Sequence, residues 1–145
     1  MPNWRNLRYF KRMVHRDALN LIRSSHIVAM PSRFEGYGFV FIEAMAAGAV
    51  ILVTNWEVQR EIADFGNAGI VSDVDAPSIG RALQSALESR TTLMQLALSG
   101  LNRYRTHYAS DVVARRYACA FAEARKRRAT LKRPMAGAGS IPLGV

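Results

Sequence analysis

The sequence contains a single cysteine and no apolar run that approaches the ~20 residues of a membrane-spanning helix. One thiol excludes an internal disulfide framework. Residues 1–5 lack the apolar stretch of a secretory signal. The three histidines are isolated, and no His/Cys/Asp cluster has the spacing of metal ligands. We therefore expect a cytoplasmic protein that holds no metal, rather than a disulfide-rich secreted protein or one that spans a membrane.

Positive charge is concentrated at the two ends of the chain. The 145 residues are enough for one domain with a single core, and they carry a net charge of +9. Residues 1–30 hold six Arg/Lys and one acid, residues 31–100 hold four Arg and eight acids, and residues 101–145 hold ten Arg/Lys and two acids. Such basic ends suit an anionic partner, and they equally suit a solvated helix face followed by a tail.

The middle of the chain alternates short apolar runs with helical patterns. Residues 27–30, 50–53 and 70–71 have the composition of buried parallel strands. Helices are predicted at 39–47, which Gly48 can end in the left-handed conformation, at 56–63, and after Pro77. This alternation predicts an α/β fold, a partial Rossmann-like parallel sheet with flanking helices. The expected buried stripe of the helix after Pro77 is Ile79, Ala82, Leu83, Ala86 and Leu87.

Residues 31–48 (PSRFEGYGFVFIEAMAAG) combine a strand end, a loop with two glycines and the start of a helix. Because a glycine loop at a helix N-terminus presents unpaired N–H groups, this segment is an anion site suited to phosphate. It also follows the carboxyl end of a parallel strand, where open α/β sheets bind ligands. Glu35 and Glu43 frame it, and carboxylates accept hydrogen bonds from sugar hydroxyls. The alternatives are a solvated loop acid for Glu35 and an acid paired with an arginine for Glu43.

The same segment resembles the signature of family 4 glycosyltransferases. The shared features are Pro-Ser-x-x-Glu-Gly-Tyr-Gly, seven residues between two glutamates, and Glu-Ala-Met-Ala-Ala-Gly. The resemblance continues through Glu61-Ile62, Asn67-Ala68-Gly69 and the aspartate-rich loop at 73–75, and it covers roughly residues 14–122. It implies the C-terminal, nucleotide-sugar-binding domain of a two-domain GT-B enzyme, here an incomplete domain at residues 1–133. The composition after Pro134 predicts a disordered tail at 134–145.

The resemblance also implies what the chain does. The family transfers a glycosyl group, often a hexosyl group, from a nucleotide sugar, with retention of anomeric configuration and without a metal or other cofactor. By motif position, Glu43 would accept hydrogen bonds from the donor ribose, and Glu35 would contact the donor sugar in the catalytic site. The donor-binding backbone would be that of Gly36, Tyr37, Gly38 and Phe39. A glycoside hydrolase also uses two carboxylates, but in this family both orient the donor.

Two features depart from the family. About thirty residues precede Pro31, which is too few for the upstream Arg and Lys that hold the donor phosphates. Asn55-Trp56-Glu57 replaces a small, often glycine-containing loop, so Trp56 either covers a strand end or marks a partner surface. We expect a separate N-terminal acceptor-binding domain or chain, no transfer by this chain alone, and no nucleic-acid partner. The alternative is a non-catalytic module of the same fold that binds a sugar nucleotide or a partner.

The basic ends generate a prediction about membranes. If residues 125–128 and 132–133 make peripheral contact with anionic lipid at the inner face of the membrane, the chain should co-sediment with anionic vesicles, and added salt should release it because screening weakens exposed charge pairs. Co-sedimentation that is absent at low salt, or that persists unchanged at high salt, would contradict this contact.

Overall fold

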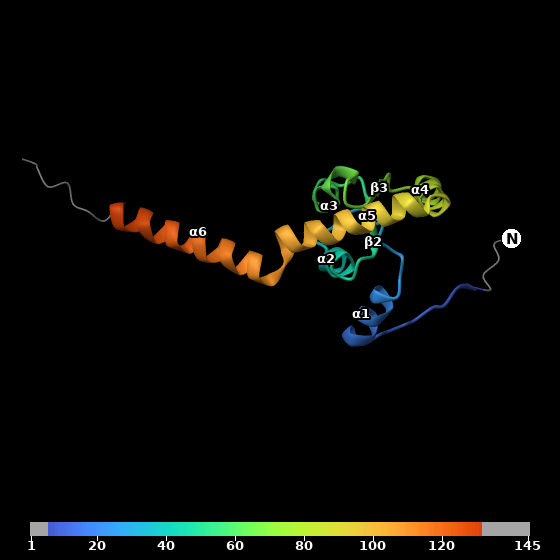
Figure 1. Cartoon of the computed structure of the whole chain (residues 1–145), viewed down its shortest axis with the longest axis horizontal. Helices are drawn as coiled ribbons and strands as arrows, with labels where there is room; N and C mark the ends of the chain where they lie inside the picture. The colour runs from blue at the N-terminus through green and yellow to red at the C-terminus, as the bar shows by residue number, and fades with distance from the viewer. Residues whose placement is uncertain (1–5, 132–145) are drawn as a thin grey trace, which may run out of the picture. The chain divides into compact units, whose positions relative to one another are not determined.

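A three-stranded parallel sheet lies within residues 6–108 (Figure 1). The structure, a computed structural model, describes residues 6–131, which divide after Tyr108 into two units that we treat separately. The strands are β1 (Ile27–Ala29), β2 (Val50–Thr54) and β3 (Ile70–Ser72), in the order β1-β2-β3. Ile27 pairs with Val50, and Leu52 pairs with Ile70. The predicted parallel sheet with flanking helices is therefore confirmed.

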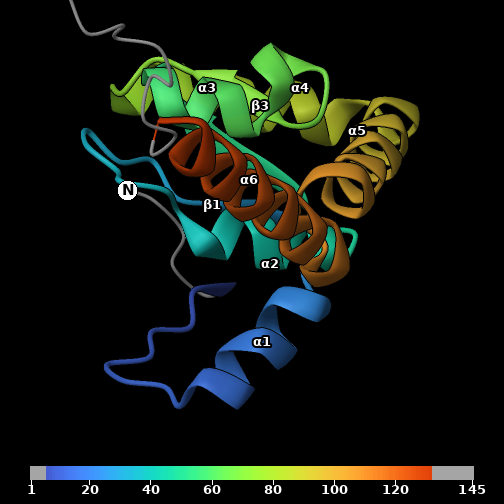
Figure 2. The ribbon, with the colours of Figure 1, turned by 90° about the vertical axis from the view of Figure 1, so that its left-hand side faces the viewer.

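Helices connect the strands and surround them. Both crossovers are helical, because α2 (Phe39–Ala46) joins β1 to β2, while α3 (Glu57–Ile62) and the 3₁₀-helix η2 (Asp64–Gly66) join β2 to β3. α1 (His15–Arg23) precedes the sheet, and α4 (Ala76–Glu88), α5 (Arg90–Arg103) and the π-helix η3 (Tyr104–Tyr108) follow it. Figures 1 and 2 show α3 and α4 on the β3 side of the unit, with α1 and α2 on the other side. Only the connecting loops, and no helix, directly follow the carboxyl ends of the strands.

The core forms around β2 and α2. All five residues of β2 are buried, and because successive strand side chains point to opposite faces, the sheet is covered on both sides at its centre. Phe41, Ala44 and Met45 of α2 pack with Ile51 and Val53 of β2 in this cluster. Deletion of a side chain this well buried typically costs about 2–5 kcal/mol. The core therefore fixes where α2 begins and which way the loop before it points.

Two glycines with positive φ bound α2. Gly38 is its N-cap, with φ 67°, and a Cβ there would lie 2.4 Å from Cδ2 of Phe41. Gly48 follows the helix with φ 78°, as predicted for the residue that ends it. Only glycine adopts such conformations without steric cost. The glycines thus set both ends of the helix that carries Glu43.

A buried polar network ties the loop after β1 to the loop after β2. The Gln59 side chain is fully buried, and its Oε1 accepts from the Thr54 N–H at 2.8 Å and from the Thr54 hydroxyl at 2.9 Å. Gln59 Nε2 donates to the Ser32 carbonyl at 3.3 Å, and the single Thr54 hydroxyl proton is shared between Gln59 Oε1 and the same carbonyl. Since buried polar groups need partners, these bonds hold Ser32 against the end of β2.

The helix after Pro77 agrees with the prediction from the sequence except at one residue. Asp75 caps α4, accepting from the Ser78 N–H at 2.8 Å, and Pro77 lies in the first turn as predicted. Of the expected buried stripe, Ala86 is buried and Ile79, Ala82 and Leu83 are half-buried, but Leu87 is 67% exposed, so its prediction was wrong. Helical spacing places Leu87 at the margin of the stripe, where a small rotation of the helix about its axis determines whether a side chain is buried or exposed.

The second unit contains α6 (Ser110–Leu131). The basic run 125–128 lies in its last turns and is exposed. The helix also presents Tyr117 and Phe121, whose rings stack at 6.4 Å. No helix among the described residues is long and apolar enough to cross a bilayer. Lys132, Arg133 and the predicted tail at 134–145 lie outside the described residues.

The buried network yields a stability prediction. Gln59→Leu should lower the free energy of unfolding by about 1–3 kcal/mol, because it leaves the Thr54 N–H buried without an acceptor. Chemical denaturation measures the loss, and hydrogen exchange should accelerate at residues 32–38. Gln84→Leu, at an exposed position of α4, is the matched control and should change neither quantity. Equal effects of the two substitutions would contradict the role given to Gln59.

Candidate functional site

The glycine loop leaves β1 in a turn that its own side chains stabilise. Ser32 Oγ donates to the Phe34 carbonyl at 2.6 Å and accepts from the Phe34 N–H at 3.3 Å. Glu35, half-buried, folds back so that its Oε1 accepts from the Gly36 N–H at 3.0 Å. A Cβ on Gly36 would meet nothing within 4 Å, so the backbone there is open to an approaching ligand.

The N-terminus of α2 is not capped by any side chain. The Gly38 cap residue has no side-chain hydrogen bond to offer, and no acid lies in the first turn. The Phe41 N–H bonds to the Gly38 carbonyl at 2.9 Å, which leaves the earlier N–H groups directed out of the helix end. The dipole adds roughly half a positive charge at this point. The loop and helix end together therefore favour an anion, as the sequence pattern predicts.

Glu43 lies one turn further along α2, on the side that faces α1. Its side chain is 30% exposed, and its Oε1 lies 3.7 Å from Nε2 of His15, whose side chain is 73% exposed. Glu43 lines a hollow of about 160 Å³ between α1 and α2 with Leu19, Ile22, Arg23, Ala46 and Ala47. The arginine ion pair considered as an alternative is not formed among the described residues, where the ionic neighbour of Glu43 is His15. This contact is too long and too exposed to satisfy the carboxylate.

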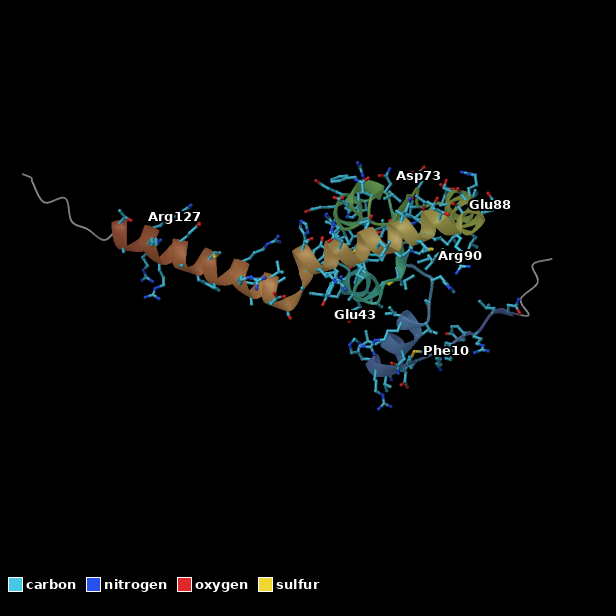
Figure 3. All side chains as sticks on the ribbon, viewed as in Figure 1. Phe10, Glu43, Asp73, Glu88, Arg90 and Arg127 are labelled. Atoms are coloured by element: carbon cyan, nitrogen blue, oxygen red, sulfur yellow. The ribbon has the colours of Figure 1, made fainter. Side chains whose placement is uncertain are left out.

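The two predicted acids do not share a hollow. Glu35 is absent from the lining of the space that contains Glu43, and its carboxylate is turned onto Gly36. Figure 3 shows Glu43 on the side of α1, and Asp73 on the far side of the unit with α3 and α4. A ligand that contacts both glutamates must therefore extend around the N-terminal end of α2, as a long molecule with two polar parts can.

Aromatic side chains surround the loop. Tyr37 and Phe39 contact each other with ring centroids 5.4 Å apart, and both are exposed. Tyr37 thus packs on an aromatic neighbour at the helix start and remains accessible. Phe34 and Trp56 form a second pair, with centroids 5.8 Å apart and an interplanar angle of 57°. Trp56 is the N-cap of α3, so this pair brings the loops after β1 and β2 together.

Two hollows open at the carboxyl ends of the strands; the sequence analysis named the loops at 55–57 and 73–75 that line them but predicted no site there. One, of about 420 Å³, is lined by Ser32, Arg33, Thr54, Asn55, Trp56, Asp73, Val74 and Asp75. The other, of about 470 Å³, includes Arg60 and Arg81. The Ser78 N–H that bonds to Asp75 lowers the pKa of that carboxyl. The available signal was topological: each of these loops follows a strand of one parallel sheet.

Metal ligation finds no support in the described part of the chain. Among residues 6–131, no group of three or more His, Cys, Asp or Glu side chains lies close enough together to hold a metal ion.

Comparison with solved structures shows what this arrangement is similar to. A sucrose-phosphate synthase from Thermosynechococcus elongatus matches with a TM-score of 0.68 and 20% identity, over 77% of this chain and 28% of that one. WaaG, a glycosyltransferase involved in lipopolysaccharide biosynthesis, matches with a TM-score of 0.55 and 25% identity, over 66% of this chain and 26% of that one. The chain thus spans just over a quarter of either structure. Comparison with curated proteins gave no match.

The family comparison rests on sequence. The model of the glycosyl transferases group 1 matches residues 2–102, which include the glycine loop, both glutamates and the whole sheet. This range begins before the expected 14–122 and ends within α5, so α6 lies outside it. A match over more than half of the chain, together with a GT-B-like parallel sheet, shows that the chain belongs to the group 1 family of glycosyl transferases.

Proposed function

We propose that this chain binds the nucleotide-sugar donor of a retaining, metal-independent glycosyl transfer. The observation that carries the proposal is the uncapped N-terminus of α2 behind an open glycine loop, at the carboxyl end of β1. A diphosphate placed there meets backbone N–H groups and the positive end of the helix dipole. The proposed donor contacts are the backbone from Gly36 to Phe39.

The hollow beside Glu43 suits the ribose of the donor. A ribose offers two adjacent hydroxyl donors, and the Glu43 carboxylate can accept from both. The hollow is otherwise mostly apolar, with Leu19, Ile22, Ala46 and Ala47 in its lining, so a charge-assisted bond there is poorly screened. The contact of His15 with Glu43 is long, at 3.7 Å, so a ligand can replace it.

Glu35 and the loop backbone would act on the sugar end of the donor. From its place before Gly36, the Glu35 carboxylate reaches hydroxyls of a sugar held over the loop. As the glycosidic bond to the diphosphate breaks, negative charge grows on the leaving phosphate. The N–H groups at the start of α2 stabilise that charge, which is the electrostatic task that another enzyme gives to a metal. In this proposal, no cofactor other than the donor itself takes part.

The acceptor side of the reaction needs further protein. The chain covers 28% and 26% of the structures it resembles, and we propose that a separate domain or chain supplies most of the acceptor site. A hexosyl group, a cytoplasmic location and peripheral contact of the basic ends with a membrane remain parts of the same proposal.

Substitution of Glu43 tests the ribose contact. Glu43→Ala should weaken nucleoside diphosphate binding about a hundredfold, since it removes two charge-assisted hydrogen bonds. Glu43→Gln keeps the size and should cost less. Calorimetric titration of UDP, GDP and ADP into the wild type and both variants measures the effect.

Thermal melts on the same samples distinguish binding from folding. Glu57→Ala removes an exposed acid from the first turn of α3 and is the matched control, with unchanged affinity expected. A lowered melting temperature with unaltered affinity for Glu43→Ala would refute the ribose contact. Failure of all three nucleotides to bind the wild type would refute the donor proposal itself.

A further inference from the structure

The 420 Å³ hollow draws its lining from all three strands. Ser32 and Arg33 follow β1, Thr54 to Trp56 end and follow β2, and Asp73 to Asp75 follow β3. Its volume falls within the roughly 300–1,000 Å³ of small-molecule sites. The donor contacts proposed above use none of these side chains, so the hollow requires its own account.

Trp56 provides the hollow with an aromatic face. The side chain is 42% exposed, although Trp is highly buried on average. Phe34 supports it at 5.8 Å, and the Trp56 N–H bonds to the Thr54 carbonyl at 2.8 Å. The ring is therefore held in place by the loop without being covered by the core. A rigid, half-open aromatic face is a stacking surface.

The same lining offers hydrogen-bond acceptors and an amide. The Asp73 carboxylate has one long contact, to Asn55 Nδ2 at 3.5 Å, and no ion pair among the described residues. Asp75 uses one oxygen on the Ser78 N–H. A carboxylate accepts up to about four hydrogen bonds, so both acids have unused capacity. Hydroxyl groups are among the donors that such a lining accepts.

The charge of the lining separates two classes of ligand. Asp73, Asp75 and Arg33 line the hollow, and Arg81 of the adjoining hollow acts on Asp75, so the two acids are matched by these two arginines and the lining suits a neutral ligand. A neutral pyranose fits, because it has an apolar C–H face for an aromatic ring and a rim of hydroxyls for carboxylate and amide groups. Arg33 also stands two residues before Glu35, a distance of at most about 7 Å along extended chain. A sugar in the hollow therefore lies beside the loop proposed to hold the donor.

We propose that this hollow binds the sugar ring of a glycosyl acceptor, with Trp56 against its C–H face and Asp73 and Asn55 on its hydroxyls. The role of that ring as acceptor rests on the proposed function, whereas its binding does not. The site would add an acceptor contact on the proposed donor-binding domain itself.

Fluorescence of Trp56 tests the binding. The chain has two tryptophans, so Trp4→Phe leaves Trp56 as the sole reporter in the full-length protein. Methyl α-D-glucopyranoside, methyl β-D-galactopyranoside and methyl α-D-mannopyranoside are titrated without nucleotide. We expect at least one to change the Trp56 emission saturably in the millimolar range. No saturable change with any of them up to ~100 mM, where a site of this class would be filled, overturns the proposal.

Variants locate the binding in the hollow. In the same background, Asp73→Asn should weaken the responsive glycoside roughly fivefold to tenfold through loss of a charged acceptor. Asp17→Asn, an exposed acid on α1, is the matched control and should leave the affinity unchanged. Trp56→Ala, followed by saturation-transfer NMR, should abolish binding, whereas Phe65→Ala, an exposed aromatic in η2, should not. Equal losses in a variant and its control overturn the assignment.

Nucleotide titration of the same protein keeps the two proposals distinct. Glycoside binding without nucleotide binding supports the hollow as a sugar site and refutes the donor function. Nucleotide binding without glycoside binding supports the donor function and refutes the hollow as a sugar site.

Discussion

The buried amide of Gln59 is the interaction on which the arrangement of the loops depends. Its oxygen and nitrogen join the end of β2 to the Ser32 carbonyl, so the loop after β1 cannot move without exposing three polar groups to an apolar core. The glycine turn, the Glu35 carboxylate and the start of α2 all follow Ser32 in the chain. At the surface, the aromatic contact between Phe34 and Trp56 also joins the loop after β1 to the loop after β2. The loops of the candidate site thereby share a fixed base.

The sequence predicted the sheet because its strands are short, apolar and separated by helices. The central run 50–53 is buried on both faces of the sheet, so it is continuously apolar and does not alternate apolar with polar residues. The glycines at 38 and 48 bound α2 for reasons visible in the sequence, since a glycine before and after an apolar helix indicates a change of backbone direction. Leu87 was misplaced because periodicity gives the centre of a buried stripe but not its width.

The candidate site was predictable in its loop and not in its surroundings. Motif spacing located Glu35, Gly38 and Glu43, but it could not show that Glu43 faces α1 while Glu35 turns onto Gly36. Those directions depend on the helix axis and on side-chain rotamers, which the packing of Phe41 and Met45 decides. Gln59 escaped notice for a related reason: a glutamine in a short amphipathic helix is ordinary until the fold buries it.

The bond between Glu35 and the Gly36 N–H has a consequence for selectivity. The acid already has a partner from its own backbone, so in the proposed donor site a sugar hydroxyl would enter by exchange of hydrogen bonds. An exchange of similar hydrogen bonds gains little affinity. A sugar that lacks the hydroxyl, or presents it in the wrong direction, leaves the loop in its self-bonded form at no energetic penalty. In the proposed donor site, discrimination at this position would depend on how readily the Glu35 carboxylate leaves the Gly36 N–H, and little on the strength of the new hydrogen bond.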